Sequence, residues 1–198
     1  ALRRKLLDHP NQRTSHETPT PRGGGLAIVI TFLAGCFFLF DWETVRHWNH
    51  LHALLVGGIP VAVVGWLDDH GHVRAWVRLL VHGLAAAAAV YFLEHVTMLD
   101  WVLGVRIGVL AYLPPILVIV WFINLYNFMD GIDTLATLEA IFIGIVAGVF
   151  LFVGGYHELA VVSWMLAAAT SGFLIWNLPP ALIFMRSEER RVGKECTL

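Results

Sequence analysis

The sequence carries little charge and almost no cysteine. Charged residues make up 14% of its 198 residues, whereas hydrophobic residues make up 58% and the mean hydropathy is +0.70. Because a soluble domain carries about 25% charged residues, this shortage excludes an ordinary soluble domain. The net charge of −2 provides no basic surface, so we predict no nucleic-acid partner. The two cysteines, Cys36 in an apolar stretch and Cys196 in a polar tail, exclude a disulfide framework and a cysteine metal site.

Long apolar stretches dominate the rest of the chain. Six of them approach the roughly 20 residues that a helix needs to cross a bilayer. They cover residues 24–40, 51–67, 76–93, 107–123, 137–153 and 159–176. We therefore predict an all-α, polytopic membrane protein with about six transmembrane helices in the lipid bilayer. Pro114 and Pro115 predict a kink in the fourth stretch, and Gly144 and Gly148 in the fifth indicate close helix packing.

The basic residues are distributed unequally between the two sets of loops. Loops 1–23, 68–75, 124–136 and 177–185 fall on one side and contain Arg3, Arg4, Lys5, Arg13, Arg22 and Arg74. Loops 41–50, 94–106 and 154–158 fall on the other side and contain only Arg46 and Arg106. Because basic residues are enriched in cytoplasmic loops, the first side is predicted to be cytoplasmic.

Two acidic clusters end apolar stretches on this predicted cytoplasmic side. Asp68 and Asp69 follow the second stretch. Asn124, Asn127, Asp130 and Asp133 follow the fourth, and their spacing of three residues places them along one helical face. Carboxylates near lipid are costly, so two clusters on one side suggest a divalent cation and a phosphate-bearing substrate. The alternatives are a span that simply ends in soluble residues, and a polar helix end capped by asparagine.

A third motif, T-P-T-P-R-G-G-G at 18–25, precedes the first apolar stretch. The Arg22 guanidinium suits phosphate, and the glycine backbone N–H groups are candidates for binding an anion. A Pro/Gly loop that merely enters a helix would have the same sequence.

Taken together, four motifs resemble a known enzyme family. They are P-T-P-R-G-G-G, L-D-D, W-F-I-N-L-Y-N-F-M-D-G-I-D and W-N-L-P-P-A-L-I-F-M, in this order within residues 1–185. This combination is similar to the polyprenyl-phosphate N-acetylhexosamine-1-phosphate transferases of glycosyltransferase family 4. The O-antigen-initiating branch is the nearer one, and phospho-MurNAc-pentapeptide translocase is a more distant relative.

The resemblance implies an Mg²⁺-dependent phosphoglycosyl transferase, with Mn²⁺ as an alternative ion. Such an enzyme transfers a sugar 1-phosphate from a UDP-N-acetylhexosamine-type donor to undecaprenyl phosphate and releases UMP. The implied location is the bacterial cytoplasmic membrane, with the active site on the cytoplasmic face. A homodimer is left open, and so is the identity of the sugar.

The resemblance also implies roles for individual residues. Asp68 and Asp69 match the paired acids tied to Mg²⁺ and the lipid phosphate. Asn127 and Asp130 match polar residues that are essential to the site, and with the two acids they form the expected catalytic set. The expected substrate-binding set is Thr20, Arg22, Asn124, Asp133, Asn177 and Phe184. Within it, Asp133 and Asn177 match uridine contacts, and Phe184 matches an aromatic residue near the uracil.

Both ends of the chain depart from the family pattern. Relatives continue F-M with Gly-Asp-x-Gly-Ser, whose aspartate ligates Mg²⁺, whereas Arg186 and Ser187 follow here. Residue 1 is alanine and no signal-peptide pattern precedes the basic residues. We expect residues 1–185 to be an incomplete transferase domain, the segment 186–198 to be non-native, and the chain by itself to be inactive.

Two other classes compete with an enzyme. A multi-pass transporter would place its functional acids near the bilayer midplane on broken helices. Here the acids lie at the ends of apolar stretches, and the Pro114–Pro115 break carries none. A membrane scaffold without catalysis would not need the asparagine–aspartate stripe.

Overall fold

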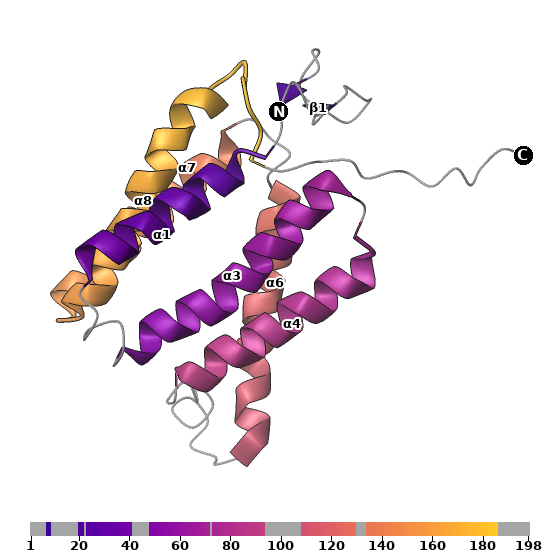
Figure 1. The fold of residues 1–198 in the computed structure, drawn as a ribbon. Helices are drawn as coiled ribbons and strands as arrows, with labels where there is room; N and C mark the ends of the chain where they lie inside the picture. The colour runs from indigo at the N-terminus through magenta and orange to yellow at the C-terminus, as the bar shows by residue number, and fades with distance from the viewer. Residues whose placement is uncertain are drawn as a thin grey trace, which may run out of the picture.

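Helices make up nearly all of the described chain (Figure 1). The computed structural model describes residues 7–8, 20–21, 23–40, 48–71, 73–93, 108–129 and 134–185. The helices are α1 (Gly25–Leu39), α3 (Asn49–His70), α4 (Ala75–Phe92), the 3-10 helix η2 (Gly108–Tyr112), α6 (Leu113–Met129), α7 (Leu135–Val153) and α8 (His157–Asn177). Two short antiparallel strands, β1 (Leu7–Asp8) and β2 (Thr20–Pro21), precede them.

Every predicted apolar stretch overlaps a helix, in the predicted order, and the fourth stretch overlaps both η2 and α6. The helical segments Asn49–His70, Ala75–Phe92, Leu110–Met129, Leu135–Val153 and His157–Asn177 are long and apolar enough to cross a membrane. The helix α1 is shorter, with 15 residues, and at about 1.5 Å per residue it is shorter than the roughly 30 Å hydrocarbon core. The prediction of an all-α, polytopic membrane protein is confirmed, with five membrane-length helices plus α1 in the described part.

One predicted boundary, and the predicted kink inside the fourth stretch, differ from the structure for local reasons. The helix α3 continues through Asp68 and Asp69 to His70, so these acids lie in its last turn and not in a loop. Pro114 and Pro115 lie in the first turn of α6, directly after η2, and so do not interrupt its interior. Proline is tolerated there because the first backbone N–H groups of a helix have no intrahelical partner.

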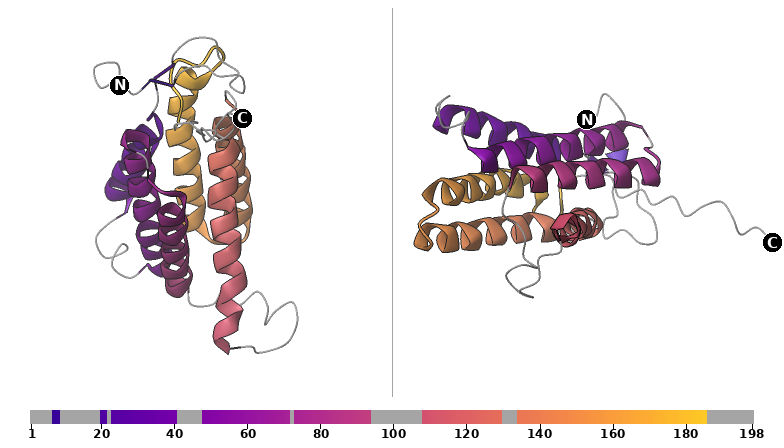
Figure 2. Two further views of the ribbon diagram at one scale, coloured as in Figure 1. Left: turned by 90° about the vertical axis from the view of Figure 1, so that its right-hand side faces the viewer. Right: turned by 90° about the horizontal axis from the view of Figure 1, so that it is seen from below.

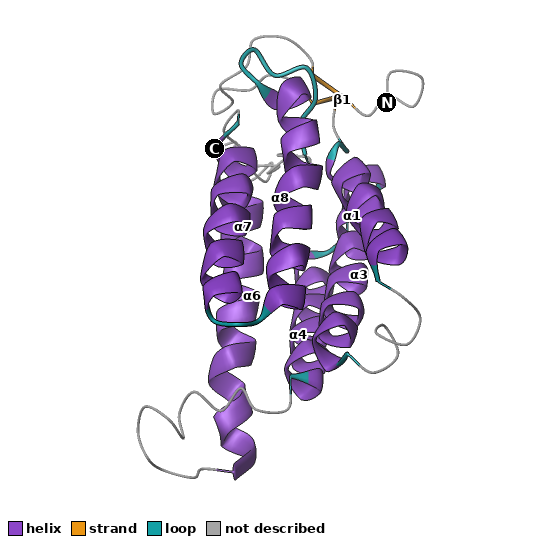
Figure 3. Cartoon of the chain, turned by 90° about the vertical axis from the view of Figure 1, so that its left-hand side faces the viewer, coloured by secondary structure: helices purple, strands orange, loops and turns teal. Residues whose placement is uncertain are grey.

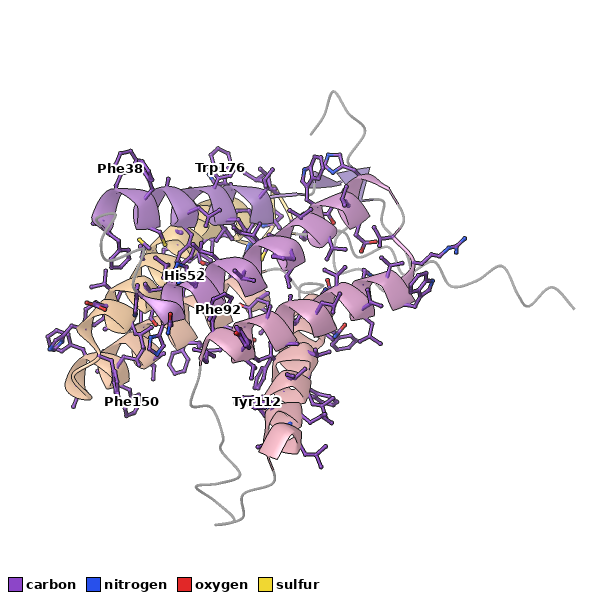
Figure 4. All side chains as sticks on the ribbon, turned by 60° about the horizontal axis from the view of Figure 1, so that its bottom comes forward. Phe38, His52, Phe92, Tyr112, Phe150 and Trp176 are labelled. Carbon is purple, nitrogen blue, oxygen red and sulfur yellow. The ribbon has the colours of Figure 1, made fainter. Side chains whose placement is uncertain are left out.

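The helices pack mainly in pairs. The helix α8 lies between α7 and α1, while α3 lies against α4, and α4 against α6 (Figures 1 and 2). At one end of the α3–α4 pair, the rings of His52 and Phe92 are 5.8 Å apart (Figure 4). Phe38, Phe150 and Trp176 point away from the bundle and are 82%, 75% and 53% exposed. Such apolar outer faces suit a helix bundle that is surrounded by lipid.

Small residues bring α7 and α8 together. A Cβ at Gly144 would lie 2.9 Å from the Ser163 carbonyl oxygen and 3.0 Å from the Ala167 Cβ. A Cβ at Gly148 would lie 2.2 Å from the Trp164 ring nitrogen. The interpretation of this G-x-x-x-G pair as a packing feature is therefore confirmed.

The helix ends that carry the predicted site gather at one end of the bundle (Figure 3). They are the beginnings of α1 and α7 and the ends of α3, α6 and α8. The described helix ends that flank the loops predicted to share a side therefore lie together in the structure. Their assignment to the cytoplasm stays a prediction.

Candidate active site

Asp68 ties the end of α3 to the start of α4. Its Oδ1 accepts a hydrogen bond from the Val73 backbone N–H at 3.1 Å. Its Oδ2 lies 2.6 Å from Nη1 of Arg78 in a partly buried ion pair. Both carboxylate oxygens therefore have protein donors, and the turn between the two helices is fixed by one side chain.

Asp69, the next residue, faces the interior. It is 9% exposed and lines an apolar cavity of about 820 Å³ that follows α3 from Leu51 to Asp69. Leu26, Val61 and Ile119 contribute to the cavity wall from α1, α3 and α6. Asp69 is the one acid among the described residues that line this cavity. Successive helical residues differ by about 100° in direction, so one acid bonds to the α3–α4 turn while its neighbour reaches the cavity.

The polar stripe begins on α6. Asn124 and Asn127 lie on the exposed surface of this helix, and Asn124 Nδ2 donates to the Val120 carbonyl at 2.7 Å. Between them, Tyr126 lines the cavity, and its hydroxyl donates to the Ala136 carbonyl on α7. Asp130 and Asp133 lie outside the described residues.

Asn177, the last residue of α8, is buried and bonded to other elements. Its Oδ1 accepts from the Thr134 backbone N–H at 3.1 Å and from the Thr137 hydroxyl at 2.7 Å. Its Nδ2 donates to the Ile183 carbonyl at 3.1 Å. The Thr134 hydroxyl in turn donates to the Asn177 carbonyl at 2.9 Å. The predicted contact of Asn177 with uridine stays a prediction.

Phe184 is also buried, with 2% of its surface exposed. Its carbonyl accepts from the Gly24 N–H, and the Met185 carbonyl accepts from the Gly25 N–H, both at 3.0 Å. A Cβ at Gly24 would lie 2.2 Å from the Phe173 ring. The interpretation of the glycine run as an anion-binding loop is therefore wrong for Gly24 and Gly25, because these glycines join the start of α1 to the segment after α8.

The remaining predicted residues are described only in part. The backbone of Thr20 belongs to β2, while its side chain and all of Arg22 lie outside the described residues. Within the part of the chain that the structure describes, no three His, Cys, Asp or Glu side chains form a group that could bind a metal ion. That search covers Asp68 and Asp69 but neither Asp130 nor Asp133.

Comparison with known proteins shows the family to which the sequence belongs. Residues 51–185 match the family described as glycosyl transferase family 4. The chain belongs to glycosyl transferase family 4. The match begins at the first buried residue of α3 and includes Asp68, Asp69, Asn127, Asn177 and Phe184.

Relatives of this family 4 chain are identical to it at about one residue in three. The undecaprenyl-phosphate α-N-acetylglucosaminyl 1-phosphate transferase of Thermotoga maritima is 30% identical over 93% of this chain and 52% of its own length. A probable undecaprenyl-phosphate N-acetylglucosaminyl 1-phosphate transferase of Bacillus subtilis is 32% identical over 93% and 51%. The phospho-N-acetylmuramoyl-pentapeptide-transferase of Streptococcus thermophilus is 28% identical over 85% and 53%. The chain thus spans about half the length of these relatives.

Sequence reasoning missed three side chains that organise the family 4 site. Arg78, Thr134 and Thr137 are not among the residues that the sequence motifs single out. Arg78 could have been found from the sequence, because an arginine near the start of an apolar span needs an acidic partner and Asp68 and Asp69 lie just before it. Thr134 and Thr137 gave no such signal, because their partner Asn177 lies 43 and 40 residues away in sequence.

Proposed function

We propose that the native protein transfers a sugar 1-phosphate from a UDP-N-acetylhexosamine-type donor to undecaprenyl phosphate and releases UMP. Family membership and the names of the relatives support this reaction class. The position of Asp69 is the observation that carries the proposal. It is a buried carboxylate in the last turn of a membrane-length helix, where an apolar cavity begins. A reaction between a polar nucleotide sugar and a lipid phosphate requires such a boundary between polar and apolar surroundings.

The chemistry is a phosphoryl transfer. An oxygen of the lipid phosphate forms a bond to the phosphorus that carries the sugar, while the bond from that phosphorus to the UMP oxygen breaks. UMP leaves with the bonding electrons, and the product is a lipid-linked sugar pyrophosphate. Catalysis of this kind depends chiefly on positioning and on stabilisation of charge.

The described residues fit an Mg²⁺ requirement. Mg²⁺ is commonly bound by one or two carboxylates together with substrate phosphates, and Asp69 lines the cavity with such a carboxylate. We assign Asp69 and Asp68 to the ion, with Mn²⁺ as the alternative, and Asp68 also fixes the turn through Arg78. When bound, the ion would neutralise the pyrophosphate and stabilise the leaving UMP.

The other residues receive their roles from the family pattern. Asn127 and Asp130 complete the catalytic set. Thr20, Arg22, Asn124, Asp133, Asn177 and Phe184 are proposed to form the substrate-binding set. We place this site on the cytoplasmic face of a bacterial inner membrane, where UDP-sugars are available, and assign initiation of a cell-surface polysaccharide such as O-antigen. Homodimer formation is a further proposal. A transporter would place its functional acids near the bilayer midplane, so the position of Asp69 at the end of α3 argues against that class.

Acid-to-amide substitutions test the proposal. In membranes that contain the protein made from its complete native gene, we expect Asp69→Asn and Asp130→Asn to slow UMP release at least a hundredfold. The loss of one ion-binding or phosphate-positioning group costs on the order of 3 kcal/mol. The assay combines UDP-N-acetylglucosamine, undecaprenyl phosphate and Mg²⁺.

Glu158→Gln is the matched control, because Glu158 is exposed at the opposite end of the bundle and should retain normal UMP release. Near-normal release by Asp69→Asn would contradict the role of that residue. The 198-residue chain by itself should release no UMP above background, since it spans about half of its relatives.

A further inference from the structure

The start of α7 lacks a local cap, although its N-cap residue is a threonine. An N-cap threonine normally accepts a hydrogen bond from a backbone N–H of its own helix, which stabilises the start of the helix. Thr134 makes no such bond, and its hydroxyl donates to the Asn177 carbonyl at the end of α8. The local interaction is thus replaced by a contact between two helices.

Thr134 also adopts a strained backbone conformation. Its φ is 70°, a left-handed value that a β-branched residue rarely adopts. Such conformations are costly, persist only where the surroundings enforce them, and cluster at functional sites. Here the enforcing contacts are the two hydrogen bonds that join Thr134 to Asn177.

The Asn177 side chain is largely committed to these contacts. A side-chain amide has one oxygen with two lone pairs and one nitrogen with two donors. Thr134 and Thr137 use both lone pairs, and Ile183 uses one of the donors. One side-chain N–H is left that could reach a bound ligand, while the other three hydrogen-bonding positions hold neighbouring elements.

The bond to the Thr134 N–H has a consequence for the acidic motif, by which we mean residues 130–133 with Asp130 and Asp133. That nitrogen belongs to the peptide bond that joins Asp133 to Thr134, so Asn177 anchors the point where the motif enters α7. Thr137, with 1% of its surface exposed, donates to the same oxygen and so orients the amide. Three elements therefore meet at one side chain, namely the beginning of α7, the end of α8 and the segment after α8.

We propose that Asn177, Thr134 and Thr137 form a clasp that positions the acidic motif, which makes Thr137 and Asn177 positioning residues. This inference rests on the proposed phosphoglycosyl transfer, because the motif matters through that reaction. It adds a positioning role to the substrate contact that is proposed for Asn177.

The clasp is tested with Thr137→Val in the protein made from its complete native gene. Valine keeps the volume of threonine and removes the hydroxyl, so the apolar packing is preserved. We expect kcat to fall about tenfold while KM for the UDP-sugar changes less than threefold. Thr137→Ser, which retains the hydroxyl, should restore kcat. Combined with Asn177→Ala, Thr137→Val should add little further loss, because both changes disrupt the same unit.

Thr170→Val is the matched control. Thr170 is a threonine with 2% exposure on α8, and its hydroxyl bonds to the Leu166 carbonyl of its own helix. This variant should keep kcat and KM. Full activity of Thr137→Val would overturn the clasp. So would a large rise in donor KM for Asn177→Ala while Thr137→Val stays harmless, since that pattern indicates a nucleotide contact.

Hydrogen exchange separates failure of the clasp from failure of the proposed reaction. Deuterium uptake by a peptide that spans residues 130–137 should be faster in Thr137→Val and Asn177→Ala than in the wild type and Thr170→Val. This measurement needs no turnover. If the wild-type protein releases no UMP but shows this pattern, the proposed function fails while the anchoring is retained. Unchanged uptake in both clasp variants would refute the anchoring itself.

Discussion

At the scale of single residues, two adjacent aspartates have different surroundings. Asp68 bonds to Val73 and Arg78, whereas Asp69 faces the apolar cavity. This division follows from helical geometry, because consecutive side chains cannot point the same way. Asp68 therefore fixes the turn between α3 and α4, whereas Asp69 is the acid that lines the cavity.

Arg78 should therefore matter more than its neighbour Arg74. We expect Arg78→Met to reduce turnover about tenfold, which corresponds to about 1.4 kcal/mol, because Asp68 loses its ion-pair partner at 2.6 Å. Arg74→Met removes the same charge from the same turn, but Arg74 is exposed, so turnover should stay within about twofold. UMP release by both variants in membranes decides the point. Equal losses would attribute the effect to net charge in the turn instead of to the Asp68–Arg78 pair.

The polar residues of the site could be recognised in the sequence, but their hydrogen-bond partners could not. A carboxylate at the end of an apolar stretch is visible in sequence, because its cost in lipid demands an explanation. The partners of Asn177 are not visible, since Thr134 and Thr137 lie more than one helix away along the chain. The glycine run was misinterpreted for the same reason, because the carbonyl partners of Gly24 and Gly25 belong to Phe184 and Met185.

At the scale of secondary structure, the apolar stretches predicted the helices but not their limits. Length and hydropathy suffice to locate a membrane-length helix, because lipid leaves the backbone few other ways to satisfy its hydrogen bonds. The limits depend on polar residues that remain helical, as Asp68 and Asp69 do in α3. The proline pair at Pro114 and Pro115 marks the start of α6, which a stretch defined by hydropathy alone places too early.

The close approach of α7 and α8 leads to a prediction about stability. We expect Gly144→Val to lower the stability of the detergent-solubilised protein by about 1–3 kcal/mol, as overpacking does. A Cβ at Gly144 already lies 2.9 Å from a backbone carbonyl oxygen of α8, and that oxygen cannot move without the helix. The midpoint of heat-induced loss of the monodisperse size-exclusion peak measures the change.

Gly172→Val on α8 is the control, because nothing lies within 4 Å of a Cβ at Gly172. Its melting midpoint should match the wild type within a few degrees. If the two variants lost stability equally, helix propensity and not the contact between α7 and α8 would be responsible.

At the scale of the whole molecule, the bundle has two distinct ends. One end contains Asp69, the clasp and the glycine contacts of α1, while the other contains the His52–Phe92 contact and the turn between α7 and α8. Each membrane-length helix therefore runs between the end with the polar contacts and the opposite end of the bundle. The arginine distribution predicts which end faces the cytoplasm. Labelling of single cysteines at opposite ends of the bundle tests this prediction.

Cysteines at Gly71 and Glu158 should report opposite sides of the membrane. Gly71 tolerates a side chain, since its φ of −159° is extended and its Cβ would have only the Leu67 carbonyl oxygen at 4.0 Å. Glu158 is exposed at the start of α8. In a background with Cys36→Ala and Cys196→Ser, a membrane-impermeant maleimide should label Glu158→Cys in intact spheroplasts. It should label Gly71→Cys only after the membrane is opened. The reverse pattern would place Asp69 outside the cytoplasm and remove the cytosolic UDP-sugar as its donor.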